Sequence, residues 1–289
     1  MRLTLPGRTI GFPRRPLVMG IVNVNDDSFS GDGTLDIDAA ISRAQAHVLA
    51  GADIIDVGAE SARTNRGPVP VDEEVRRLRG FLERWATAWR ALRPRDDEQV
   101  WPPVLSVNTW RPDVVEAVLS TRAIDLLNDI GALPNERNAT LCADHGTALL
   151  IMHSVGAPKV PHLDQRWNDI VGSMLGFFEE KLAMAVAAGV PHEALIIDPG
   201  LDFAKQRDDN LAVLRDLFAL DRFGRPVLVP LSRKTFIGEV LGIPDPQDRD
   251  AGTIACMAAC MPQGDAGRIL RVHHSDAAWQ ALKTLAALG

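Results

Sequence analysis

The chain contains eight short apolar runs that each end in polar side chains, and segments with helical character separate the runs. The polar residues at these ends are Asn23, Asp56 to Glu60, Asn108, Asn128 with Asp129, His153, Asp198, Ser232 with Lys234, and Arg271 with His273. Strands that alternate with helices predict the α/β class with a parallel sheet. Eight such units favour a closed (β/α)8 TIM barrel, in which the C-terminal strand ends form the active site.

An open doubly wound sheet is the competing architecture, and it would place a glycine-rich phosphate turn directly after the first strand. The loop after Asn23 lacks the G-x-G-x-x-G spacing of such a turn. With 289 residues, the chain has a size that a single α/β barrel commonly reaches. We therefore expect one barrel over residues 17–289. Residues 1–16 are expected to form an extended lead-in, with a hairpin around Pro6-Gly7 that covers one barrel mouth.

The apolar runs and the helical patterns give approximate bounds for each unit. Strands are expected at 17–23, 53–58, 104–108, 124–127, 148–152, 194–197, 226–229 and 268–272. Helices are expected at 39–49, 72–92, from 112, at 167–188, at 209–220, from 235, from 251 and at 276–288. Pro112 suits the first position of its helix, and the acidic first turn at 72–74 suits the helix dipole.

The composition argues against several classes of function. The 31 basic and 38 acidic side chains give a net charge of −7, whereas nucleic-acid binding usually leaves a basic patch. No signal peptide is visible and no run approaches the roughly 18 apolar residues of a membrane span, so we expect a cytoplasmic protein without membrane contact. The three cysteines, Cys142, Cys256 and Cys260, fit a reducing compartment. They predict buried packing rather than a zinc site.

Asn108, Asn128 and Asp198 end three different strands, so their side chains can converge on the barrel rim. Together they supply a carboxylate, two amide carbonyls and two NH2 groups. This set suits a flat heterocycle with alternating donors and acceptors, such as a pterin or a purine. Each residue alone would more readily be explained as a helix cap or a turn. Three at equivalent positions favour a binding site.

Basic side chains gather after the last two expected strands, in Ser232-Arg233-Lys234 and Arg271-Val272-His273. The loops after these strands are the usual phosphate site of a TIM barrel. Lys, Arg and His hold phosphate oxygens by charge-assisted hydrogen bonds. Arg63, in the loop after the second strand, could close over the same anion.

Three further polar residues can be explained without a role in binding. His153 is equally compatible with a packed core position and with a ligand role. Asp202 and Lys205 follow the Asp198-Pro199-Gly200 turn at a spacing that favours a surface ion pair over chemistry.

Several motifs, in this order along the chain, resemble those of the dihydropteroate synthase family. They are Met19 to Val24 with Asp27 to Ser30, Gly51 to Gly58 with Glu60, Ser61 and Arg63, Asn128-Asp129, Met152-His153, Asp198-Pro199-Gly200, Ser232 to Gly238, Gly252-Thr253, and Arg271-Val272-His273. The resemblance covers the chain from about residue 17 onward. It implies a (β/α)8 barrel that joins 4-aminobenzoate to 6-hydroxymethyl-7,8-dihydropterin diphosphate and releases pyrophosphate, with help from Mg2+ as the cofactor.

The resemblance also implies a role for individual residues. Those expected at the pterin are Asn108, Asn128, Met152, Asp198 and Lys234. Those expected at the diphosphate are Asn23, Arg63, Arg271 and His273, with Asn23 also near the metal. Those expected at the amine acceptor are Phe29, Ala62, Arg63, Thr64, Phe203 and Ser232. Catalytic roles fall to Asn108, Lys234 and Arg63, and the family suggests a homodimer through the late helices.

The chain departs from the family pattern at several positions. The usual Ser-Val-Asp-Thr is Ser106-Val107-Asn108-Thr109, so an amide stands where the family has a carboxylate thought to stabilise a cationic intermediate. The usual Gly-Phe-Gly-Lys is Asp202-Phe203-Ala204-Lys205. The loops after the first two strands change as well, at 25–29, 31–33 and 61–65, and His274 replaces the usual Asp.

These departures leave several functions open. The leading hypothesis is a dihydropteroate synthase-like transferase of folate biosynthesis that carries out the full reaction. The alternatives are a non-catalytic pterin-binding paralogue and a related transferase with a different amine acceptor or pterin. A methyl-transfer module partnered with a corrinoid protein is disfavoured, since Lys234, Arg271 and His273 would have no obvious task in it.

Overall fold

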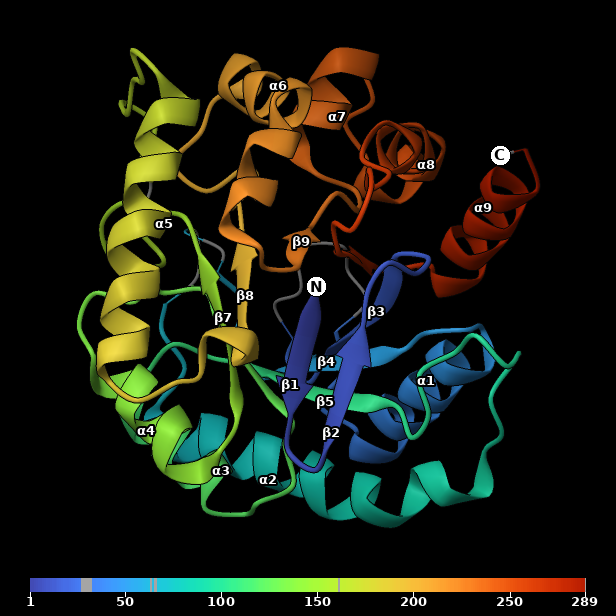
Figure 1. Cartoon of the computed structure of the whole chain (residues 1–289). Helices are drawn as coiled ribbons and strands as arrows, with labels where there is room; N and C mark the ends of the chain where they lie inside the picture. Colours follow the sequence, from blue (N-terminus) through green and yellow to red (C-terminus); the bar gives the residue numbers. More distant parts are fainter. Residues whose placement is uncertain (27–32, 63, 65–66, 161, 289) are drawn as a thin grey trace.

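The eight parallel strands of this protein close into a barrel, as Figure 1 shows. The computed structural model describes residues 1–26, 33–62, 64, 67–160 and 162–288. The strands of the barrel are β3 (Leu17–Asn23), β4 (Ile54–Gly58), β5 (Val104–Asn108), β6 (Leu126–Asp129), β7 (Ala148–Met152), β8 (Leu195–Asp198), β9 (Val227–Val229) and β10 (Arg268–Val272). They neighbour each other in chain order, and β10 pairs in parallel with β3 to complete the ring. The predicted (β/α)8 barrel is therefore confirmed.

Helices follow the strands and cover the outside of the barrel (Figure 1). They are α1 (Ile37–Leu49), α2 (Val71–Ala88), α3 (Pro112–Leu119), α4 (Arg137–His145), α5 (Ile170–Ala187), α6 (Arg207–Arg215), α7 (Thr235–Leu241), α8 (Asp250–Ala259) and α9 (Ser275–Leu288). Short 3-10 helices lie at Trp89–Ala91, His192–Ala194, Leu217–Phe223 and Pro246–Arg249. Each barrel strand is apolar along most of its length because it is covered by side chains on both faces.

Three helices differ from the sequence-based expectation, each for a local reason. The sequence pattern assigned no helix to the segment 124–148, but the structure has α4 there. This helix ends at Gly146, which takes the left-handed conformation. The helix expected from 167 begins at Ile170 because the Asp169 side chain caps it. The helix expected over 209–220 stops at Arg215 and continues as a 3-10 helix.

The lead-in forms an antiparallel hairpin of β1 (Arg2–Leu5) and β2 (Arg8–Gly11). One face of this hairpin is apolar, and its side chains Leu3, Leu5 and Ile10 are buried. Burial of this face against the barrel removes apolar surface from water, which stabilises the folded state.

The hairpin covers the N-terminal ends of the barrel strands, on the side opposite the polar rim. Arg8 forms an ion pair of 2.9 Å with Asp125, directly before β6. The Phe12 ring packs so closely on Gly267, directly before β10, that a Cβ atom there would lie 3.0 Å from it. None of the helices searched in the described parts of the chain is long and apolar enough to cross a membrane.

The cysteines lie as the composition predicts. Cys142 and Cys260 are buried, Cys256 is partly buried, and all three thiols are free. Burial raises the pKa of Cys260 to about 12, which keeps this thiol protonated and unreactive near neutral pH.

Candidate active site

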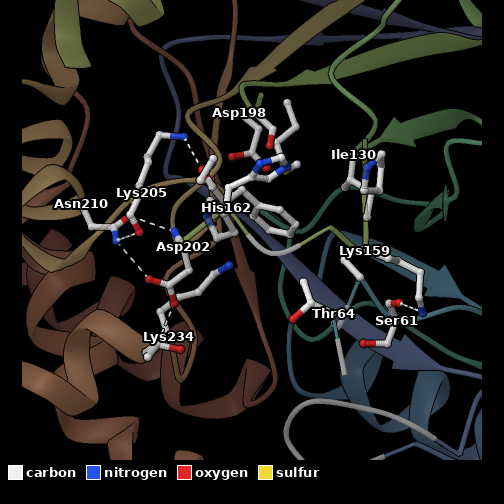
Figure 2. Close-up of a pocket in the computed structure, with 18 of the residues that line it drawn as sticks. Ser61, Thr64, Ile130, Lys159, His162, Asp198, Asp202, Lys205, Asn210 and Lys234 are labelled. Carbon is white, nitrogen blue, oxygen red and sulfur yellow. Dashed lines mark hydrogen bonds between the residues drawn. The ribbon is translucent and has the colours of Figure 1, made fainter. Parts of the chain in front are cut away.

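A cavity of about 550 Å³ opens at the C-terminal ends of the strands. Its lining includes the predicted residues Asn23, Ala62, Thr64, Asn108, Asn128, Met152, Asp198, Phe203, Ser232, Lys234, Arg271 and His273. Figure 2 shows Asp198, Lys205 and Lys234 on one wall and Ser61, Thr64 and Lys159 across the cavity. The predicted site residues Arg63 and Phe29 lie outside the described residues. The structure thus brings the other predicted side chains together in one place.

Strand register explains why residues far apart in sequence meet here. Asn23 pairs with Gly58, Gly58 pairs with Asn108, and Asn108 pairs with Asn128 across four consecutive strands. Residues paired in this way point to the same side of a parallel sheet. A Cβ at position 58 would lie in van der Waals contact with the Cβ of Asn108, at 3.4 Å, so Gly58 and Asn108 are direct neighbours on this floor. The amide side chains therefore line one continuous floor.

Asp198 ends β8 and lies at this floor, where only 3% of its surface is exposed. Burial raises the pKa of Asp198 to about 6, although the Gly200 N–H and the cations Lys234, Lys205 and Arg271 act in the opposite direction. The carboxylate accepts the Gly200 N–H at 2.7 Å. At neutral pH the site thus keeps a buried anion, surrounded by cations, that can accept hydrogen bonds from a ligand.

Asp56 is a fully buried carboxylate that the sequence places at a strand end but to which no binding or catalytic role was assigned. It accepts hydrogen bonds from Ser106 Oγ at 2.6 Å, Asn128 Nδ2 at 3.1 Å and Arg271 Nε at 2.8 Å. It therefore joins a residue expected at the pterin to one expected at the diphosphate. The signal was present in the sequence, since a carboxylate interrupts an apolar strand two residues before that strand ends.

The turn after β9 directs its first two side chains to different partners. Ser232 Oγ lies 2.8 Å from His273 Nδ1 and accepts the His273 N–H at 3.2 Å, which joins this turn to the end of β10. Arg233 instead forms a two-pronged ion pair with Asp250 on α8. Arg233 therefore holds the start of α8, while Ser232 and His273 line the cavity.

Lys234 follows in the same turn and points its amine toward the loop after β8. Its Nζ donates to the Leu201 carbonyl at 2.7 Å and lies 4.9 Å from the centre of the Phe203 ring. Burial lowers the pKa of Lys234, while Asp202 and Asp198 raise it. The amine is thus held at the cavity wall, close to the carboxylate of the floor.

Lys205 was expected in a surface ion pair with Asp202, and this expectation is wrong. Lys205 is only 6% exposed, and its amine donates to the carbonyls of His153, Gly200 and Phe203 at 3.2, 3.0 and 3.0 Å. Burial lowers the pKa of Lys205 to about 7. The residue therefore ties the loops after β7 and β8 together beside the cavity.

His153 takes the packed position that the sequence left open beside a ligand role. It is 2% exposed, and its ring centre lies 4.9 Å from that of Phe177 and 5.4 Å from that of Trp167. Burial lowers the pKa of His153 to about 3, so the ring is neutral at physiological pH. It supports the cavity from behind, as one of several aromatic side chains in this part of the core.

A buried ion pair connects the loops after β4 and β7. The amine of Lys159 donates to the Ser61 carbonyl at 2.8 Å and lies 3.3 Å from Glu60 Oε1 (Figure 2 labels Lys159 and Ser61). The other oxygen of Glu60 lies 2.9 Å from the Arg111 guanidinium. The contact of Lys159 with Ser61 and Glu60 fixes the two loops against each other at the cavity mouth, and neither loop sequence alone predicts it.

Comparison with known proteins places this geometry in a family. The model of the pterin-binding enzyme family matches residues 19–273. The dihydropteroate synthase of Synechocystis is 36% identical over 277 residues, which cover 95% of this chain and 91% of the relative.

Solved structures give the same result. The dihydropteroate synthase of Yersinia pestis, in a sulfonamide drug complex, superimposes with a TM-score of 0.87 at 33% identity, covering 100% of this chain and 99% of the other. The Thermus thermophilus enzyme in complex with 4-aminobenzoate superimposes with a TM-score of 0.83 at 36% identity, with both chains fully covered. The barrel, the polar side chains at its C-terminal end and these relatives together show that the chain belongs to the dihydropteroate synthase family of pterin-binding transferases.

Proposed function

We propose that the protein condenses 6-hydroxymethyl-7,8-dihydropterin diphosphate with 4-aminobenzoate or a related arylamine and releases pyrophosphate. One observation carries the proposal: hydrogen-bonding groups for a flat heterocycle and cations for a diphosphate face a single cavity. Asn128 and Asp198 supply the first set, and Arg271 and His273 supply the second. The known complex of the Thermus relative with 4-aminobenzoate supports the identity of the acceptor class.

The floor of the cavity suits the pterin ring. Asn128 donates one amide hydrogen to Asp56, while its buried Oδ1 atom has no hydrogen-bond partner among the described residues. Such an acceptor is costly to leave unpaired, so a ring N–H that reaches it gains a full hydrogen bond. The Asp198 carboxylate accepts further donors from the same ring, and Met152 packs against its face.

The cations at the other end suit the leaving group. The pyrophosphate gains charge as its bond to the pterin methylene breaks, and we assign the stabilisation of that charge to Arg271, His273 and Lys234, which line the same cavity. Asp56 holds Arg271 through its Nε atom at 2.8 Å, and Ser232 holds the His273 ring. Groups fixed in this way need little reorganisation during the reaction, which is the basis of electrostatic catalysis.

The proposed reaction includes Mg2+, and the residues of the cavity fit a metal ion that takes few of its ligands from the protein. The described residues contain no cluster of three or more His, Cys, Asp or Glu side chains that could hold a metal. Mg2+ commonly keeps several waters and takes its other ligands from substrate phosphates. Asn23, at the end of β3 and in the cavity lining, would supply an amide oxygen. The ion would neutralise part of the diphosphate charge.

The acceptor amine enters from the open mouth, between Ala62 and Thr64 on one side and Phe203 on the other. An arylamine is nucleophilic without prior deprotonation, so the protein needs only to align it with the methylene carbon. Such alignment can supply a large part of the rate enhancement. We therefore assign these three side chains to acceptor positioning.

A pyrophosphate-release assay with the purified protein tests the proposal. Release is expected with pterin diphosphate and Mg2+ only when 4-aminobenzoate or another arylamine is added. Binding of the pterin diphosphate without release in the presence of any arylamine would contradict the proposal. The same samples, run without Mg2+, test the metal requirement.

A non-catalytic pterin-binding protein is the second candidate, and the residue at position 108 favours it. Asn108 carries no charge where the family carries a carboxylate. On this reading, pterin raises the melting temperature, but no pyrophosphate appears.

We further propose that the protein acts as a cytoplasmic homodimer. The end of α7 supports the association of two copies, since Val240 and Leu241 there are 55% and 48% exposed. Burial of such side chains against a second copy would remove apolar surface from water. Light scattering of the purified protein, with V240E as the disrupting variant, tests the association.

A further inference from the structure

Asp202 places a carboxylate in the cavity wall at a position where the family pattern has glycine. Its backbone has φ +65°, and the backbone of Ala204 has φ +51°. Glycine adopts this left-handed region without penalty, and aspartate adopts it more readily than most other residues. The loop therefore keeps the shape that glycine allows and gains a half-buried side chain that lines the cavity.

The carboxylate is fixed by neighbours from two helices. One oxygen accepts the Thr235 N–H at 2.5 Å, and the other lies 3.4 Å from the Phe236 nitrogen at the start of α7. Asn210 of α6 donates to the same carboxylate at 3.1 Å and accepts the Asp202 N–H at 2.8 Å. Figure 2 shows Asp202 beside Asn210, with the hydrogen bonds between them drawn as dashed lines. These bonds leave the side chain little freedom to move away from the cavity.

This wall adjoins the part of the cavity that receives the acceptor. Phe203, the next residue, was assigned to the acceptor, and its ring lies against Lys234. The amine of an acceptor must face the pterin at the floor, so its opposite end points outward toward the rim. A carboxylate at that end would approach Asp202 and the first residues of α7.

The electrostatics there are unfavourable for an acceptor that carries a negative charge. The first N–H groups of α7 already donate to Asp202, so they are not available to a ligand carboxylate. Lys234, the nearby cation, is already compensated by Asp202 and Asp198. Two like charges a few ångströms apart in a partly buried site repel strongly enough to weaken binding by roughly tenfold or more.

We propose that Asp202 is a specificity-determining residue, which disfavours arylamines with a carboxylate opposite the amine and favours those with an uncharged, hydrogen-bond-donating group. An amide group in that place would donate to the Asp202 carboxylate instead of being repelled by it. The inference rests on the proposed transferase function and names the class of acceptor that this cavity prefers.

The test compares 4-aminobenzoate with 4-aminobenzamide in the wild type and in Asp202→Asn. Asparagine tolerates the left-handed backbone, removes the charge and keeps one oxygen for the Thr235 N–H, while its NH2 group takes the place of the oxygen that accepts from Asn210 and the Phe236 N–H. The variant should raise kcat/KM for 4-aminobenzoate by roughly tenfold, mainly through a lower KM. Its kcat/KM for 4-aminobenzamide should stay the same or fall.

Asp144→Asn is the matched control, because Asp144 is exposed on α4 and does not line the cavity. It makes the same change in net charge and should leave the ratio of the two kcat/KM values within twofold. Asp202→Gly, which restores the family residue, should move this ratio in the same direction as Asp202→Asn. A ratio that changes by less than twofold in both Asp202 variants would overturn the inference.

Calorimetric binding of the two amines, with Mg2+ and pyrophosphate present, separates this inference from the proposed function. If the wild type releases no pyrophosphate with either amine, the transferase proposal fails while the binding ratio still tests Asp202. A stronger preference of Asp202→Asn for 4-aminobenzoate supports the inference. An unchanged binding ratio, or no binding of either amine to any variant, contradicts it.

Discussion

At the scale of single residues, the proposed reaction gives position 108 the greatest weight. It lies at the cavity floor, 7% exposed, in register with Gly58 and Asn128. Its amide matches the size of a carboxylate but cannot offset the positive charge that develops on the pterin methylene as the diphosphate leaves.

We expect Asn108→Asp to raise kcat for pyrophosphate release by roughly tenfold or more, because a negative charge next to the reacting carbon stabilises the transition state. The gain should shrink at low pH, where a buried carboxylate is protonated. Steady-state release assays at several pH values measure this effect. An unchanged kcat at every pH would show that position 108 does not limit the reaction.

Asp198 gives a prediction for stability as a function of pH. Its folded-state pKa of about 6 lies above the ordinary value of 3.8, so the folded protein holds this proton more tightly than the unfolded chain. The charged form therefore lowers stability, and the effect grows as the pH rises from about 4 to about 6 and then stays constant.

Asp198→Asn should therefore raise the free energy of unfolding by about 1–3 kcal/mol at pH 7.5 and by much less near pH 4. Asparagine retains an oxygen for the Gly200 N–H. Urea denaturation at both pH values measures the difference, and calorimetry should show weaker binding of the pterin. A variant less stable than the wild type at pH 7.5 would contradict this account.

At the scale of elements, the loops after β4 and β7 work as one unit because Lys159 joins them. Lys159→Met removes the contacts to Glu60 and to the Ser61 carbonyl, while Glu60 keeps its ion pair with Arg111. We expect KM for the acceptor to rise several-fold with little change in kcat, since Ala62 and Thr64 are then less firmly placed.

Lys181→Met is the control for this prediction, since Lys181 pairs with Glu180 on α5. Its side chain is 12% exposed, close to the 10% of the Lys159 side chain. Its KM should equal that of the wild type. Equal KM values in the two variants would show that the Lys159 contact does not position the acceptor.

How far the sequence predicts each element depends on whether its determinants are local. The strand over Leu17–Asn23 was predicted residue for residue, because a buried strand ends where the first polar side chain appears. Asn108, Asn128 and Asp198 were placed correctly for the same reason. The Lys159 contact was not predictable, since it forms only when two loops about 100 residues apart meet.

Lys205 shows how a local pattern misleads. Its spacing from Asp202 suggested an ion pair, but the left-handed backbone at residues 202 and 204 turns Lys205 inward, to three carbonyls. Backbone of this kind is signalled by glycine, and here the glycines are replaced. The pattern therefore gave no warning of the turn.

At the scale of the whole molecule, the apolar hairpin that covers the barrel and the candidate active site lie at opposite ends of the barrel. The hairpin of β1 and β2 covers the N-terminal strand ends, and the cavity opens at the C-terminal ends. Ile10→Ala should lower the free energy of unfolding by about 2–4 kcal/mol because it leaves a cavity beneath the hairpin. The kinetic constants of the folded variant should stay within twofold of the wild type.

Leu288→Ala is the comparison for that prediction, since Leu288 is 79% exposed at the end of α9. Loss of exposed surface there should change the free energy of unfolding by less than about 0.5 kcal/mol. A large change in KM for Ile10→Ala, measured on folded protein, would show that the two ends of the barrel are coupled.

The pairing of β10 with β3 also has a consequence for how the protein is made. During synthesis Asn128 and Asp198, which we propose bind the pterin, leave the ribosome well before Arg271 and His273, which arrive with the last strand. Asp56 then gains its partner Arg271 only when the ring closes. A nascent chain that stops short of β10 therefore lacks the Arg271 cation beside the buried Asp56 carboxylate, and on the proposed function it should bind a diphosphate weakly until the barrel closes.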